Sequence, residues 1–147
     1  SALALVAGLM LAPSMVEADE ARLTLGAAML SFPSADPDAV PSIAALENPL
    51  LVEIMVRGGH SMLSQLTVQA GGDLQSGSDK ITITSITWTA QGEGFVAGTL
   101  SKDQPQLVGQ WMGNVNRTGN LWFWLENSWS YPAGDYSQSL AYTLIAY

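Results

Sequence analysis

Apolar and polar residues alternate in short runs from residue 21 onward. The runs that predict strands cover residues 22–32, 50–57, 62–69, 80–90, 94–101, 106–113, 120–127 and 136–147. Turn-forming clusters such as Gly71-Gly72-Asp73 separate them, and helical periodicity is weak. Short strands at this spacing are typical of a β-sandwich. We therefore expect an all-β, Ig-like antiparallel β-sandwich over residues 21–147, with residues 33–49, which hold four prolines, crossing between sheets.

The first twenty residues form a separate unit, because residues 1–16 carry no charge and acidic residues follow at once. Three interpretations of this apolar N-terminal segment remain open. It is a leader remnant that resembles a secretory signal, a docked or pilin-like helix, or a β-strand donated to another subunit. Alanine and leucine favour a helix, although Pro13 limits one. The period-2 pattern favours the strand, because it places one set of residues on a single face: Leu3, Leu5, Ala7, Leu9 and Leu11.

Residues 131–147, YPAGDYSQSLAYTLIAY, predict a turn followed by a long closing strand. They resemble the last strand of spore-coat-U-type and chaperone–usher pilin domains, which end in a Pro-Ala-Gly-x-Tyr turn, an alternating strand and a terminal aromatic residue. The resemblance implies an extracellular Ig-like sandwich whose open groove accepts a strand from a neighbour. Spore-coat-U-type domains commonly carry cysteines, whereas this chain has none.

Composition narrows the classes of function. Five Lys and Arg against thirteen Asp and Glu give a net charge of −8, which argues against nucleic acid as a partner. Because the chain has no cysteine, disulfides, thiolate zinc sites and cysteine nucleophiles are excluded. The single histidine, His60, has no GxSxG motif beside it. Low charge with many small polar residues is typical of secreted proteins. We therefore expect a protein that is not an enzyme and needs no cofactor.

The acidic residues give weak candidates for chemistry. Asp36 and Asp38 could offer oxygen ligands to calcium, but Asp-Pro also opens ordinary turns. Glu53 and Glu126 lie in predicted strands, where a glycosidase could hold its acid pair at a suitable separation. The alternative is that both point outward or, if they point inward, are paired with Arg57 or Arg22.

Five tryptophans are many for 147 residues. Trp122 and Trp124 share one face of a predicted strand, and the apolar residues between and beside them share the other. Facing solvent, the pair forms a platform for sugar rings; facing inward, it belongs to the core or to subunit packing. Trp88, Trp111 and Trp129 are expected as core residues or edge plugs. Asn116 begins an Asn-x-Thr pattern in a predicted hairpin loop and is a candidate glycan position.

These observations favour the structural subunit of a secreted, extracellular or cell-surface filament. Its partners are identical subunits, and each N-terminal strand adds to the sandwich of the next through Leu3, Leu5, Leu9 and Leu11. Donor and acceptor surfaces differ, so the contact extends into an open homopolymer. A membrane enters only through a leader or the assembly machinery. The alternative is a secreted carbohydrate-binding module that holds surface glycans on Trp122 and Trp124.

Overall fold

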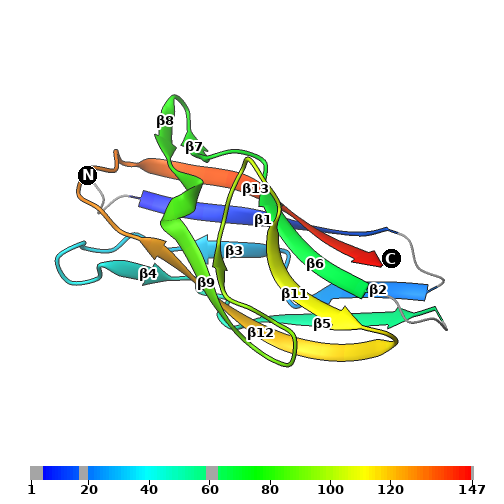
Figure 1. Ribbon diagram of the computed structural model, residues 1–147. Coiled ribbons are helices and arrows are strands. Elements are labelled where there is room, and N and C mark those ends of the chain that lie inside the picture. The colour runs from blue at the N-terminus through cyan, green and yellow to red at the C-terminus, as the bar shows by residue number, and fades with distance from the viewer. Residues whose placement is uncertain (1–4, 17–19, 59–62, 147) are drawn as a thin grey trace.

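The computed structural model describes residues 5–16, 20–58 and 63–146 (Figure 1). Strands account for nearly all of its regular structure. Their bounds are β1 Leu5–Val16, β2 Glu20–Leu25, β3 Met29–Phe32, β4 Ser42–Ala44, β5 Leu50–Arg57, β6 Leu63–Ala70, β7 Leu74–Ser76, β8 Asp79–Ile81, β9 Ile86–Gln91, β10 Gly98–Thr99, β11 Gln106–Met112, β12 Val115–Glu126 and β13 Gly134–Ala146. A 3₁₀ turn, Ile83–Ser85, precedes β9. The prediction of an all-β sandwich is therefore confirmed.

The strands form two sheets that make the two layers of Figure 1. Sheet A has the order β11-β6-β13-β1-β3, with the β7–β8 hairpin attached to β13. Sheet B has the order β10-β9-β12-β5-β2, with β4 attached to β12. Among the described strands, every pair is antiparallel except β1 and β13, which run parallel from Leu5 opposite Gly134 to Val16 opposite Ile145. The antiparallel prediction is wrong for that one pair, because most of the domain lies between its two strands and acts as the long crossover that parallel pairing needs.

The core lies between the sheets and follows the period-2 alternation of the sequence. In β5, Leu50, Val52, Ile54 and Val56 are buried while the residues between them are exposed or half-buried. The strands β6, β12 and β13 contribute alternate residues in the same way. The largest fully buried side chains are Trp88, Tyr136, Tyr142, Phe32, Phe123, Leu9, Leu30, Leu50, Ile54, Leu66 and Leu74. Where one face of a strand is polar, as in β5, the binary pattern therefore explains which face is inside.

The predicted strand 22–32 is broken at residues 26–28, where the chain passes from sheet B to sheet A. The Gly26 N–H donates to the Leu51 carbonyl at 2.7 Å, whereas the Ala28 carbonyl accepts from the Leu11 N–H at 3.1 Å. A Cβ on Gly26 would lie 3.0 Å from the Cβ of Leu51. A small residue at this position therefore lets one chain segment serve as an edge of both sheets.

Three other predictions differ from the structure. The strand expected over 80–90 is interrupted by the 3₁₀ turn Ile83–Ser85, and the strand expected over 94–101 is reduced to Gly98–Thr99. The turn expected over 116–119 is wrong, because β12 runs through it. The chain reverses earlier, at Gly113, whose φ of +72° suits glycine and few other residues.

Candidate assembly and surface sites

Residues 5–16 of the apolar N-terminal segment form β1, which lies inside sheet A between β13 and β3 (Figure 1). The twelve residues of β1 lie opposite β13, and Ala7 to Met10 also lie opposite β3. The helical interpretation is therefore wrong for residues 5–16, which form a strand, and donation of that strand to another subunit stays a prediction. In this structure of a single chain, the strand completes the chain's own sheet.

The two faces of β1 divide as the alternation predicts. Ala7 and Leu9 are 0% exposed, and Leu11 is half-buried against the core. Met10, on the opposite face, is 55% exposed. Of the other residues predicted for assembly, Leu5 begins β1, whereas Leu3 lies outside the described residues.

The slot that β1 occupies is walled by buried residues of its two neighbours. On one side Ala7 lies opposite Tyr136, and Leu11 lies opposite Leu140. On the other side Ala7 also lies opposite Phe32, and Leu9 lies opposite Leu30. All four wall residues are at most 2% exposed: Tyr136, Leu140, Phe32 and Leu30. Removing β1 would uncover this apolar lining, so the slot needs a strand.

Pro13 fits β1 because its ring nitrogen faces away from β13. The Leu11 N–H points toward β3, where it donates to Ala28. Because backbone N–H directions alternate along a strand, residue 13 points to the same side as residue 11. The missing N–H of Pro13 therefore removes no bond to β13. On the open side, Leu11 and Pro13 border a groove of about 390 Å³ with residues 25–28.

The far edge of β3 is held independently of β1. The Ser31 N–H donates to Oε1 of Glu47 at 2.6 Å, and the Ser31 carbonyl accepts from the Leu46 N–H at 2.9 Å. These two bonds are the ones that another strand would make. The segment after β4 thus covers the sheet edge and anchors one wall of the slot.

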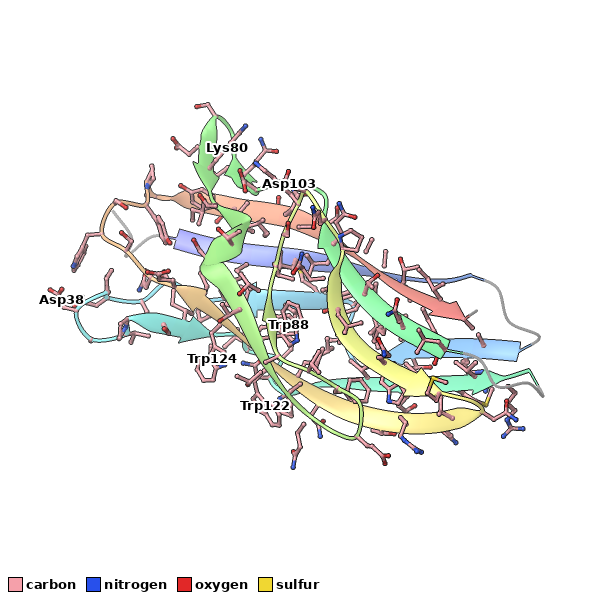
Figure 2. The ribbon with its side chains drawn as sticks, viewed as in Figure 1. Asp38, Lys80, Trp88, Asp103, Trp122 and Trp124 are labelled. Carbon is pink, nitrogen blue, oxygen red and sulfur yellow. The ribbon has the colours of Figure 1, made fainter. Side chains whose placement is uncertain are left out.

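Trp122 and Trp124 project from the outer face of sheet B, on the side of β12 away from sheet A (Figure 2). Trp122 is half-buried and Trp124 is 37% exposed, whereas Leu121, Phe123 and Leu125 are fully buried. The core interpretation of the tryptophan pair is therefore wrong. The sugar platform and subunit packing remain open.

The other three tryptophans are held by indole hydrogen bonds. Nε1 of Trp88 donates to the Val96 carbonyl at 2.8 Å, and Nε1 of Trp111 donates to the Glu93 carbonyl at 2.8 Å. Both side chains are buried, as expected. Trp129 is 47% exposed, and its Nε1 donates to Oδ1 of Asp38 at 3.0 Å.

The calcium candidates belong to a turn. Oδ1 of Asp36 accepts the Asp38 N–H at 2.9 Å, which is an Asx turn, and Asp38 accepts the indole of Trp129. Over residues 5–16, 20–58 and 63–146, no three His, Asp or Glu side chains gather to hold a metal ion. His60 lies outside the described residues.

Glu53 and Glu126 are both exposed, and the strand register keeps them apart. Glu53 lies opposite Thr118, which is eight residues from Glu126 along β12. At about 3.3 Å per residue the separation is about 26 Å. The carboxyl groups of a glycosidase pair lie within about 10 Å of each other, so these two cannot act as one.

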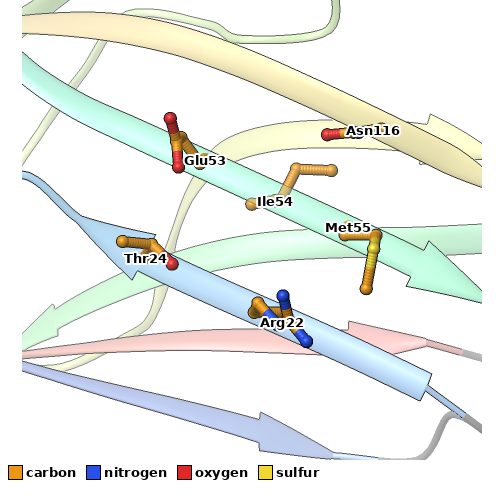
Figure 3. Close-up of a pocket in the computed structure, with 6 residues that line it drawn as sticks. All are labelled: Arg22, Thr24, Glu53, Ile54, Met55 and Asn116. Atoms are coloured by element: carbon orange, nitrogen blue, oxygen red, sulfur yellow. The ribbon is translucent and has the colours of Figure 1, made fainter.

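Glu53 instead borders a shallow depression of about 150 Å³ on the outer face of sheet B (Figure 3). Arg22 and Thr24 of β2, Ile54 and Met55 of β5 and Asn116 of β12 line the rest of it. Glu53 is exposed, which agrees with the alternative that it points outward. Within the described part of the chain, the ion pairs are Lys102 with Asp73 and Arg117 with Glu93, so Glu53 is not paired with an arginine. Asn116 is exposed in β12 opposite Met55, so its predicted hairpin position is wrong.

The groups with perturbed pKa values include the Asp73 carboxyl and the Tyr142 hydroxyl. Oδ2 of Asp73 lies 2.8 Å from Nζ of Lys102, and its Oδ1 accepts the Ile83 N–H at 2.9 Å. These bonds lower the pKa of the Asp73 carboxyl. The hydroxyl of Tyr142 is buried and has no hydrogen-bond partner among the described residues, and burial raises its pKa. The hydroxyl of the similarly buried Tyr136 donates to the Pro132 carbonyl at 2.7 Å.

Comparison with protein-family models and with curated proteins finds no match to this chain. Over the described residues there is no helix with the length and hydropathy needed to cross a membrane.

Proposed function

We propose that this protein is the structural subunit of an extracellular or cell-surface filament, in which β1 of one subunit fills the slot between β13 and β3 of the next. One observation carries the proposal. The inward face of β1 is fully buried at Ala7 and Leu9, in a slot whose walls have partners of their own. A strand with these properties can be supplied by a neighbour through strand addition, which combines backbone hydrogen bonds with apolar side chains in pockets.

The energetics suit exchange between identical subunits. Burial of a leucine side chain such as Leu9 contributes about 1.5–3 kcal/mol. A second copy of β1 would make the same contacts in the same register, so the exchanged state loses none of them. Because the donating strand and the accepting slot are different surfaces, each subunit can donate once and accept once. The contact is heterologous, and it propagates as a fibre.

Two sequence features support the same proposal. The closing strand resembles that of pilin-type domains, and it is the strand against which β1 lies. Low charge and many small polar residues agree with secretion.

Cysteine cross-linking between two variants tests the proposal, because the native chain has no thiol to interfere. Ala12 and Ala141 lie opposite each other on the exposed face of sheet A. One preparation carries Ala12→Cys, and an isotopically heavier one carries Ala141→Cys. They are mixed, allowed to form fibres and oxidised, and the disulfides are identified by mass spectrometry.

The expected product is a disulfide between one light and one heavy chain, since neighbouring Cα atoms across a sheet lie within disulfide reach. The matched control replaces Ala141→Cys with Ser137→Cys, which lies opposite Gly8 and is four residues out of register. The proposal fails if the mixture forms no fibres, or if fibres form and the in-register pair cross-links no better than the control.

A further inference from the structure

The outer face of β12 carries a straight row of four side chains. Asn120, Trp122, Trp124 and Glu126 occupy successive alternate positions, so they all point away from the core. Alternate residues of a strand lie about 6.6–6.8 Å apart, and the whole row spans about 20 Å. Two indoles thus lie between an amide and a carboxylate.

The backbone beneath the two indoles is held on both sides. Trp122 and Trp124 lie opposite Thr89 and Thr87 of β9. On the other side, the Asn48 side chain receives the Phe123 N–H at 2.9 Å and donates to the Phe123 carbonyl at 2.8 Å. The Asn48 side chain therefore makes the two backbone hydrogen bonds that a neighbouring strand would make to Phe123, the residue between the two tryptophans. A platform fixed in this way loses little conformational freedom when it binds a ligand.

Polar groups beside the indoles remain available for a ligand. The side chains of Thr87, Thr89, Asn120 and Glu126 make no hydrogen bond within the part of the chain that the structure describes. They can donate to and accept from hydroxyl groups. Ala44, opposite Trp124 on β4, is too small to cover the indole.

We propose that this row binds a neutral polysaccharide chain lying along β12. A sugar ring has an apolar C–H face that packs on an indole and a rim of hydroxyls that needs polar partners, and the row offers both in alternation. None of the five Lys and Arg side chains belongs to the row or to the residues opposite it, so an anionic polymer is disfavoured. A protein partner would need about 800 Å² of surface, whereas the large apolar side chains outside the core at and opposite the row are the two indoles and Leu51.

The proposal goes beyond the filament function and does not depend on it. The row lies on sheet B, whereas β1 and its slot belong to sheet A. Strand exchange and glycan binding can therefore be tested separately and can coexist in one subunit.

Calorimetric titration of the full chain with cellohexaose, chitohexaose and laminarihexaose tests the proposal. We expect at least one of these hexasaccharides to bind, and Trp122→Ala or Trp124→Ala to weaken binding about tenfold or more. Trp124→Phe, which keeps an aromatic face, should retain part of the affinity. Trp129→Ala is the matched control, because it removes an exposed tryptophan that lies in a turn outside the row. Circular dichroism on each variant verifies that the sandwich is folded.

The proposal is overturned if none of the three hexasaccharides binds at millimolar concentration. It is equally overturned if Trp122→Ala and Trp129→Ala affect binding alike. A third contrary result is that Trp124→Ala impairs fibre formation while no sugar binds, which would assign the row to subunit packing.

Discussion

A disulfide that ties β1 to its own β13 should separate folding from assembly. The double variant Ala12→Cys/Ala141→Cys places two thiols on exposed, directly opposed positions of the parallel pair. Adjacent strands lie about 4.8 Å apart, which is inside the Cα range of natural disulfides. With β1 bound covalently to its own sheet, the strand cannot enter a neighbour.

The magnitude follows from the size of the closed loop. The bond joins residues 12 and 141 and so closes a loop of about 130 residues, for which the chain-entropy relation gives about 5 kcal/mol of added stability. Engineered disulfides commonly deliver less, so any clear rise in the free energy of unfolding agrees with the register. The oxidised variant should therefore be a more stable protein that forms no fibres, and reduction should restore the fibres.

The assay compares fibre growth by light scattering and electron microscopy, with and without reductant. The control is Gln69→Cys/Ala141→Cys, which joins β13 to β6 and leaves β1 free. It should gain comparable stability and still assemble. Fibres that grow from the oxidised Ala12→Cys/Ala141→Cys protein at the wild-type rate would refute the reasoning, because β1 would then play no part in the contact.

Three further predictions concern individual side chains. Leu9→Asp should lower the free energy of unfolding by several kcal/mol and abolish fibres, because it buries a charge. Ala12→Asp, at an exposed position, should change the unfolding midpoint little. Equal effects of the two variants in denaturant titrations would contradict the assigned faces of β1. Tyr142→Phe should raise the melting temperature, because it removes a buried hydroxyl without a partner among the described residues. Tyr136→Phe should lower the melting temperature, because it breaks the hydrogen bond to the Pro132 carbonyl. If both variants lowered the melting temperature, the Tyr142 hydroxyl would have to have a hydrogen-bond partner. The pKa of Asp73 is lower in the folded than in the unfolded protein, so its stabilisation is present above pH about 4 and is lost as the pH falls through the folded pKa. The difference in melting temperature between wild type and Asp73→Asn should therefore shrink from pH 7 to pH 2, and a constant difference would exclude this linkage.

The sequence predicted which face of a strand a residue occupies far better than it predicted which strands pair. Alternation correctly placed Leu9 inside and Met10 outside, because a period of two determines which side of any sheet a residue occupies. It could not predict that β1 lies parallel to β13, since pairing depends on contacts between segments more than a hundred residues apart. The resemblance of residues 131–147 pointed to the closing strand, but it did not identify the strand beside it.

Turn chemistry explains the main local error. Asn116 and Gly119 predicted a hairpin, yet both lie within β12, and Gly119 packs where a Cβ would meet the ring of Phe95 at 2.6 Å. A glycine needed for close approach carries the same sequence signal as a glycine needed for a turn. The outward direction of Trp122 could not be decided from the sequence either, because both faces of its strand are apolar. Which face of β12 points outward is decided by which face packs against the other sheet, and one strand's sequence does not contain that information.

The two walls of the β1 slot explain why a subunit could keep its fold while strands exchange. β13 pairs with β6 from Leu140 to Ala146, and β3 is anchored by Glu47 on its far side. Neither wall therefore depends on β1 alone for its place. Since the contacts made before and after exchange are the same, the equilibrium depends mainly on subunit concentration, and the rate depends on freeing the twelve-residue ladder of β1. In the proposed filament, a strand that is well paired yet carried by independent walls would combine a stable free subunit with a stable polymer.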